Sequence, residues 1–125
     1  MNRYAIIGFG CAGYHAAEAI REIDKSSVID VYSDHSEPPY NPMLTTYLAG
    51  GKISRDAMFP FGSLEGIKKK LDLNVFTDSP VKSLDVSGKK LVLFNGAEKK
   101  YDKILISSGA RAFAPPIKGL TDASI

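Results

Sequence analysis

The sequence is poor in the residues that build covalent cross-links and metal centres. It contains a single cysteine, Cys11, together with two histidines and no tryptophan. One thiol cannot form an intrachain disulfide, and one cysteine with two histidines cannot build a zinc cluster. We therefore expect no metal ion, and we expect the protein to work in the reducing cytoplasm, where free thiols persist.

Long apolar runs and large charge imbalances are also missing. The first apolar stretch, residues 4–7, ends at Gly8 and is too short for a signal peptide or a membrane span. The net charge is only +2, and the basic clusters at residues 68–70 and 99–100 are short enough to be solvated surface. We expect neither a nucleic acid nor a membrane as a partner.

The residues that are present predict one compact α/β domain, for which 125 residues are enough. Residues 4–7 form an apolar run that is typical of a buried parallel strand, and residues 28–32 form a second one. Between them, apolar residues recur at helical spacing over about residues 11–24. Strand, glycine turn, helix and strand in this order predict a βαβ unit with a right-handed crossover.

The rest of the chain predicts shorter elements. Residues 33–62 are mostly loop, with a short helix near residues 42–49, and Ser63 caps a helix over residues 64–71. A third strand covers residues 73–76, and further strands cover residues 81–86, 90–94 and 101–106, of which 104–106 is the last parallel one. The predicted fold is a Rossmann-type, three-layer ββα domain whose parallel sheet carries an inserted antiparallel hairpin or meander.

The turn between the first strand and the first helix carries the main functional signal. Gly8, Gly10 and Gly13 match the pattern G-x-G-x-x-G. The first glycine allows a sharp turn, the second lets a pyrophosphate approach the backbone, and the third lets the helix pack close to the strand. With the backbone of Cys11 and Ala12, they are candidates for binding dinucleotide phosphates at a helix N-terminus. The alternative is a glycine-rich turn without a ligand.

The end of the second strand is where an acidic residue would bind a ribose hydroxyl. The usual position holds Ser33, and Asp34 follows one residue later; either side chain can accept such a bond. An acid here argues against a 2′-phosphate and hence against NADP, although Asp34 could instead simply start the next loop. Cys11 is either a reactive thiol at the helix start or a small packing residue, and we favour the second.

Residues 4–21, 33–50 and 101–119 form blocks that include Y-A-I-I-G-F-G-C-A-G, S-D-H-S-E-P-P-Y-N-P-M-L-T-T and Y-D-K-I-L-I-S-S-G-A-R. These blocks resemble the N-terminal FAD-binding region of the pyridine nucleotide–disulfide oxidoreductase superfamily, in its ferredoxin, rubredoxin and nitrite reductase-like, NADH-dependent branch. The resemblance implies that the glycine turn holds the pyrophosphate of FAD, with Ser33 and Asp34 near the adenosine ribose. The other cofactor-binding positions it implies are Pro42, Thr46, Val81 (by backbone pairing with adenine), Ser108, Gly109 and Arg111.

The sequence departs from the family pattern on the flavin side. The family arginine before the loop proline is missing, because Asn41 joins directly to Pro42, and a family lysine is replaced by Thr46. Because both departures concern positions beside the flavin, we still expect the chain to bind the ADP part of the cofactor. The Cys-x4-Cys pair of the disulfide-reducing members is also absent, so dithiol exchange is excluded, and the sequence offers no catalytic residue.

The resemblance implies the FAD-binding portion of an NAD(P)H-dependent flavoprotein oxidoreductase. In such an enzyme NADH delivers hydride to FAD, and electrons then pass to an acceptor such as a small iron–sulfur or rubredoxin-type protein. We expect residues 1–125 to be an N-terminal fragment that is inactive alone, with residues 112–125 starting a linker to an NAD-binding domain. The alternatives are a non-catalytic module that binds NAD, FAD or ADP, and an inert fragment that forms a homo-oligomer through exposed apolar surface.

Overall fold

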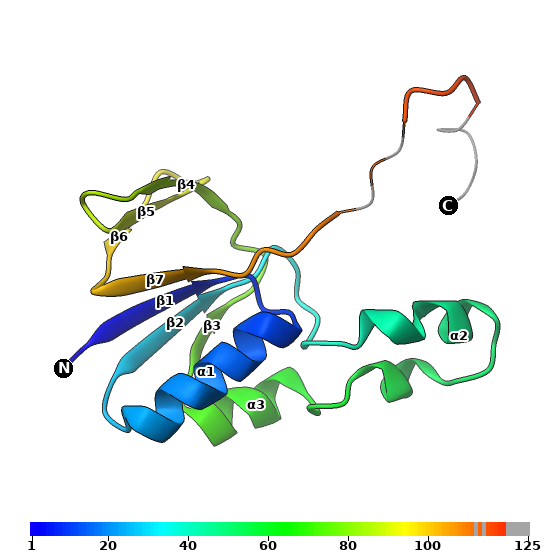
Figure 1. Ribbon diagram of the computed structural model, residues 1–125, viewed down its shortest axis with the longest axis horizontal. Helices are drawn as coiled ribbons and strands as arrows, with labels where there is room; N and C mark the ends of the chain where they lie inside the picture. Colours follow the sequence, from blue (N-terminus) through cyan, green and yellow to red (C-terminus); the bar gives the residue numbers. More distant parts are fainter. Residues whose placement is uncertain (112, 114, 120–125) are drawn as a thin grey trace.

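The computed structural model describes residues 1–111, 113 and 115–119, and it contains a parallel sheet, a separate antiparallel sheet and helices (Figure 1). The parallel sheet has the strand order β3-β2-β1-β7. Its strands are β1 (Arg3–Ile7), β2 (Val28–Tyr32), β3 (Asn74–Phe76) and β7 (Lys103–Ile106). β1 lies in the interior, where Ala5 is opposite Asp30 on one side and Ile104 on the other. The predicted parallel sheet is confirmed.

Helix α1 (Cys11–Ile23) connects β1 to β2 and completes the predicted βαβ unit. Its buried face includes Tyr14 and Ala17, which pack on the sheet. The helix ends at Ile23 and is followed by the C-cap Asp24, whose backbone N–H donates to the Ile20 carbonyl at 2.7 Å. The prediction placed the end of this helix one residue later, within the normal variation of helix termini.

Between β2 and β3 the chain forms an arm of short helices that extends away from the sheet (Figure 1). The arm contains η1 (Pro42–Leu44), α2 (Thr45–Ala49) and η2 (Arg55–Met58), and α3 (Leu64–Leu71) returns to the sheet. The predicted helix over residues 42–49 is therefore a 3₁₀ turn followed by α2. The sequence does not predict η2, because four residues are too few to show helical periodicity. Ser63 Oγ accepts from the Gly66 N–H at 3.2 Å, which confirms the cap of α3.

The inserted antiparallel unit is a meander of β4 (Val81–Asp85), β5 (Lys90–Leu93) and β6 (Glu98–Lys100). The prediction of one strand over residues 101–106 is wrong in its first part, because the chain turns between β6 and β7 at Tyr101 and Asp102. All three residues of β6 are exposed and charged, so this edge strand has no apolar alternation that the sequence could reveal.

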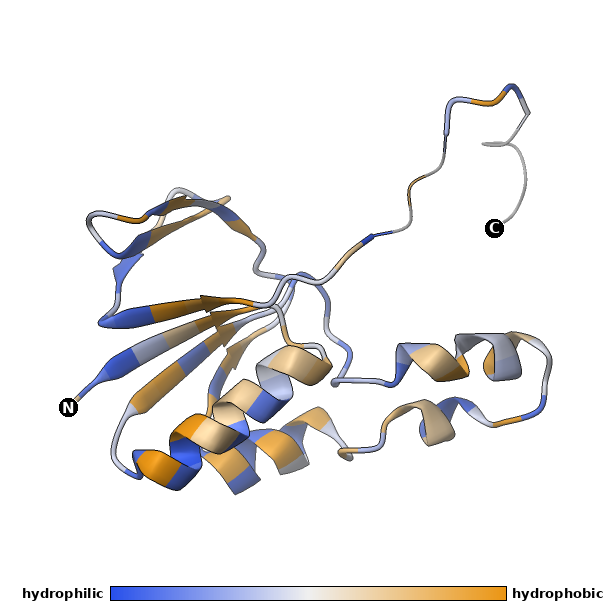
Figure 2. Ribbon diagram, in the orientation of Figure 1, coloured by the Kyte–Doolittle hydropathy of each residue, from blue (hydrophilic) through white to orange (hydrophobic). Residues whose placement is uncertain are grey.

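The inner strands of the parallel sheet are covered on both faces, whereas the edge strand β7 leaves Leu105 and Ile106 exposed. One cluster lies against α1 and α3 and includes Ile6, Ile29 and Ile67. The other lies against the meander and comprises Ala5, Tyr32, Leu91 and Tyr101. Successive residues of β1 thus point to opposite layers, and the predicted three-layer arrangement is confirmed. Figure 2 shows apolar residues along parts of β2 and β7, and apolar and polar residues alternating along α1 and α3.

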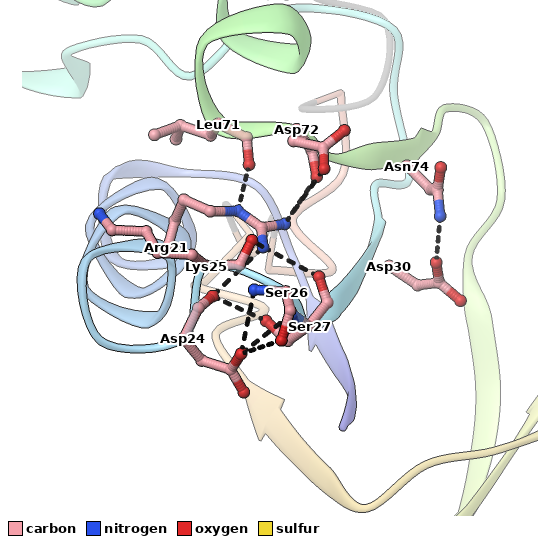
Figure 3. Close-up of polar contacts among 9 residues, drawn as sticks. All are labelled: Arg21, Asp24, Lys25, Ser26, Ser27, Asp30, Leu71, Asp72 and Asn74. Atoms are coloured by element: carbon pink, nitrogen blue, oxygen red, sulfur yellow. Dashed lines mark hydrogen bonds and ion pairs between the residues drawn. The ribbon is translucent and has the colours of Figure 1, made fainter. Parts of the chain in front are cut away.

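A buried arginine joins the C-terminal ends of α1 and α3 (Figure 3). Arg21 donates hydrogen bonds to the backbone carbonyls of Asp24, Lys25, Ser27, Leu71 and Asp72, at 2.8–3.2 Å. Carbonyls at helix C-termini lack partners inside the helix and carry partial negative charge. The Arg21 guanidinium supplies N–H donors and a positive charge to these carbonyls, so it connects the ends of both helices to the residue before β2.

A buried carboxylate joins the two sheets. Asp30 accepts from Tyr101 Oη at 2.7 Å, from Asn74 Nδ2 at 2.8 Å (Figure 3) and from Arg3 Nη2 at 3.2 Å. The hydroxyls of Tyr101 and Tyr32 are 2.6 Å apart. Burial and the hydrogen bonds to Tyr32 and Asp30 raise the pKa of Tyr101, so its hydroxyl keeps the proton that it donates to Asp30.

Within the described residues, the helices are all too short or too polar to cross a lipid bilayer.

Candidate functional site

Two adjoining cavities lie where β1, β2 and β7 end, at the carboxyl edge of the parallel sheet. This edge is where open α/β sheets bind their ligands. The larger cavity, about 630 Å³, surrounds the glycine turn and is called the turn cavity below. The smaller one, about 390 Å³, reaches towards the antiparallel sheet and is called the meander cavity. Gly8, Asp34, Ser108 and Arg111 line both.

The turn cavity brings together most of the residues that the sequence predicts for cofactor binding. Its lining residues are Gly8, Phe9, Gly10, Cys11, Ala12, Asp34, His35, Tyr40, Pro42, Ser107, Ser108, Gly109, Ala110 and Arg111. They come from the glycine turn with the start of α1, from the segment that runs from the end of β2 to the start of η1, and from the segment after β7. Three distant parts of the chain therefore meet around one turn.

The three glycines are needed for different reasons. Gly8 has a φ of +95°, and a Cβ there would lie 2.3 Å from the Ser107 carbonyl oxygen. A Cβ on Gly13 would lie 2.2 Å from the Gly8 carbonyl oxygen, so both glycines are required by close backbone packing. A Cβ on Gly10 would meet nothing within 4 Å. Because Gly10 lines the turn cavity, its missing side chain keeps open the space in front of the helix N-terminus.

Ser107 holds the glycine turn in place, and the sequence analysis missed it. Its backbone N–H donates to the Ile7 carbonyl at 2.7 Å, and its hydroxyl lies 3.1 Å from the Ile7 carbonyl oxygen and 2.9 Å from that of Gly8. The signal that could have found it is its position directly after an apolar strand that pairs with β1.

Asp34 and Arg111 form an ion pair where the two cavities join. The hydrogen bond from Arg111, together with its positive charge, lowers the pKa of Asp34, so the carboxylate is ionised and able to accept hydrogen bonds. Ser33, in contrast, is buried, and its hydroxyl accepts from the His35 N–H at 3.3 Å. Of the two residues considered for the ribose position, Asp34 is the one that faces the cavities.

Three of the predicted residues, Gly13, Ser33 and Thr46, line neither cavity. Ser33 is buried behind them, and Thr46 lies in α2 beside a separate small hollow that it shares with Tyr47 and Lys52. The other predicted residues are brought together, including Val81, which lines the meander cavity.

The meander cavity has both apolar and polar lining, and its charged residues lie where it joins the turn cavity. Its lining residues are Ile7, Gly8, Tyr32, Asp34, Pro80, Val81, Phe94, Ser108 and Arg111. The sequence does not predict Tyr32, Pro80 and Phe94 at this site, because their shared position depends on how the meander packs on the sheet. The two cavities together suit an elongated ligand with a planar apolar end and an anionic middle.

The described residues contain no group of three or more His, Cys, Asp and Glu side chains suited to a metal ion. Cys11 is exposed at the first turn of α1 and lines the turn cavity. The site therefore offers backbone donors, one ion pair and one thiol.

Comparison with known proteins agrees with this geometry. A family model described as pyridine nucleotide-disulphide oxidoreductase matches residues 2–125. An NADH oxidase of Methanocaldococcus jannaschii is 30% identical over 121 residues, which cover 94% of this chain and 27% of that protein. A rubredoxin-NAD(+) reductase of Alcanivorax borkumensis is 27% identical over 120 residues, covering 95% of this chain and 31% of that protein.

Among solved structures, a NAD-dependent persulfide reductase from A. fulgidus superposes with a TM-score of 0.84 and 30% identity. The alignment covers 94% of this chain and 23% of that one. The chain thus spans less than a third of the length of these relatives.

Proposed function

Because the chain belongs to the pyridine nucleotide-disulphide oxidoreductase family over residues 2–125, we propose that it binds FAD and holds the ADP half of that cofactor in the two cavities. The observation that carries this proposal is Gly10, whose missing side chain leaves open space beside the backbone donors of α1. A bare turn at a helix N-terminus suits a pyrophosphate group.

Each part of the site has a role in this proposal. The backbone of Gly10, Cys11 and Ala12 binds the pyrophosphate, and Asp34 accepts hydrogen bonds from the ribose hydroxyls. Val81 lies beside the adenine, at the start of the meander. Ser108 and Gly109 pass close to the cofactor where the chain leaves β7. When bound, the flavin would supply the redox chemistry, and this chain binds and orients it.

For the whole protein we propose an NAD(P)H-dependent flavoprotein oxidoreductase, because its relatives are named NADH oxidase and rubredoxin-NAD(+) reductase. Residues 1–125 would supply its FAD-binding domain, and NADH would be the electron donor. A small electron-transfer protein, of the kind named in the rubredoxin reductase, would be the acceptor. The linker proposed for residues 112–125 lies partly outside the described residues. The single free thiol supports a reducing compartment such as the cytoplasm.

A second candidate function is a non-catalytic nucleotide-binding module. Two departures from the family pattern near the expected flavin position favour it. Asn41 precedes Pro42 directly, so the family arginine is missing, and Thr46 replaces a family lysine. Thr46 also lies outside both cavities. In this case the adenosine diphosphate part would contribute nearly all of the binding energy.

Calorimetric titration of the chain with FAD, ADP and NADH separates these functions. If the chain is the FAD-binding portion of an oxidoreductase, FAD should bind more tightly than ADP, because the flavin half adds contacts. A binding module predicts equal affinities for FAD and ADP. A chain that binds neither ligand would contradict both proposals.

We further propose that the chain self-associates through the edge of its parallel sheet. β7 is the last strand in the sheet order, and Leu105 and Ile106 on it are exposed. An apolar groove of about 510 Å³ lies between β7 and α1. Two copies of one edge strand are self-complementary about a two-fold axis. Sedimentation that shows only monomer at high concentration would contradict this.

A further inference from the structure

We infer that Phe94 forms the movable wall of the adenine subsite and stacks on the base of the bound nucleotide. The inference rests on the proposed function, since it assigns the meander cavity to the adenine end of the ligand. Neither the sequence pattern nor the family resemblance singles out this residue.

Phe94 is placed at the cavity by the pairing of the meander strands. Val81, at the start of β4, is opposite Leu93, the last residue of β5. Phe94 follows directly and lines the meander cavity, with 68% of its surface exposed. A large aromatic side chain that is mostly exposed at the mouth of a cavity is available to a ligand, and burying it is favourable.

The backbone around Phe94 is held firmly. In the turn that follows, the Gly96 N–H donates to the Leu93 carbonyl at 3.0 Å, and the Ala97 N–H donates to Asn95 Oδ1 at 3.0 Å. Two residues earlier in the same strand as Leu93, Leu91 is fully buried against the parallel sheet. The backbone position of Phe94 is therefore set, and its exposed side chain is accessible to a ligand.

The other aromatic residue of this cavity cannot play that part. Tyr32 stacks on Phe76, with ring centroids 5.0 Å apart and planes at 15°, and its hydroxyl lies 2.6 Å from that of Tyr101. Its ring is fixed from two sides and is almost fully buried. Tyr32 therefore forms a rigid floor, and Phe94 is the aromatic residue of this cavity that has free surface.

The chemistry of the cavity fits a base rather than a charged group. Pro80, Val81 and Phe94 make an apolar slot, and the only charged lining residues are Asp34 and Arg111, at the junction with the turn cavity. A planar base in the slot would have its ribose at Asp34 and its phosphates at the glycine turn. That order of apolar, hydroxyl and anionic groups is the order found in ADP.

The test compares Phe94→Ala, Phe94→Leu and the unaltered chain by calorimetry with ADP, FAD and FMN. FMN contains the flavin and a phosphate but no adenine. We expect Phe94→Ala to weaken ADP and FAD binding about tenfold, the usual effect of losing one aromatic partner of a base, and to leave FMN binding unchanged. Phe94→Leu, which keeps apolar area without a flat ring, should have an intermediate effect. Val86→Ala is the matched control, because Val86 is exposed on the same meander but lines neither cavity.

A second measurement does not depend on affinity. Nuclear Overhauser effects between adenine protons of bound ADP and the ring protons of Phe94 are expected. If Phe94→Ala binds ADP as the unaltered chain does, or weakens FMN equally, this inference is wrong and the proposed function stands. If the unaltered chain binds neither ADP nor FAD, the proposed function is wrong and the inference fails with it.

Discussion

Replacing Gly10 by alanine should strongly weaken binding of the proposed cofactor without damaging the fold. The backbone at Gly10 has φ −84° and ψ −162°, which is extended and open to any residue. A new Cβ would meet no protein atom within 4 Å and would project into the turn cavity. The methyl group would occupy the space that the pyrophosphate needs in order to reach the backbone donors of α1.

The expected magnitudes follow from these contacts. Alanine is a poorer helix N-cap than glycine by about 1 kcal/mol, whereas the loss of glycine's freedom in the unfolded chain returns about 0.4–1 kcal/mol. The free energy of unfolding should therefore change by less than about 1 kcal/mol. Each hydrogen bond to a charged group contributes about 1.5–3 kcal/mol, so losing two of them at the pyrophosphate should weaken FAD binding by at least about 100-fold.

The matched variant is Gly13→Ala, whose Cβ would lie 2.2 Å from the Gly8 carbonyl oxygen. The Gly8 carbonyl is backbone and cannot easily move away from the new Cβ, so we expect a loss of about 3 kcal/mol or more in the free energy of unfolding. Urea unfolding and titration with FAD give the two quantities for each variant. Unchanged FAD affinity in Gly10→Ala, or a stability loss equal to that of Gly13→Ala, would refute the reasoning.

Three further changes test the supports of the site. Arg21→Met should lower the free energy of unfolding by about 3 kcal/mol or more, measured in urea, because several buried carbonyls lose their donor, and Arg21→Lys should recover little of it. Tyr101→Phe should cost about 1–3 kcal/mol in the same assay, because Asp30 loses a buried hydrogen bond; a neutral result would contradict that role. Arg111 lowers the pKa of Asp34, so the stabilisation by this pair is present at neutral pH and lost as the pH falls through the lowered pKa. Arg111→Ala should return the titration of Asp34, followed by the NMR shift of its carboxyl carbon, towards that of an ordinary aspartate.

The elements with a strong local pattern could be predicted from the sequence. The bounds of β2 and α3 agree with the prediction, because an apolar run between turn residues and an N-cap serine are signals within one short stretch. The edge strand β6 could not be predicted, because its residues are charged and its pairing with β5 is decided by the preceding turn. The 3₁₀ helix η2 is likewise too short for any periodicity.

The same contrast holds for the site. The glycine turn lies between a predicted strand and a predicted helix, and Asp34 follows the second predicted strand. Their place in the turn cavity could therefore be predicted from the sequence. The sequence marks Ser107 only as the residue after an apolar strand, and its contact with a turn about a hundred residues earlier cannot be predicted from that position. Phe94 has no local signal, because its place at the cavity depends on the packing of two sheets. The burial of Ser33 is similar, since alternation in β2 and the neighbouring β3 decide which way it points.

The contact between Ser107 and the first turn has a consequence for the order of assembly. The residues that shape the glycine turn lie at opposite ends of the folded region: Gly8 packs against Ser107, and Ser107 bonds to both Ile7 and Gly8. All residues up to Ser107 must therefore be synthesised before that turn acquires its final shape. Binding of the proposed cofactor would then have to wait until β7 has paired with β1, and a chain that ends before residue 107 would keep the glycine motif without the contacts that shape it.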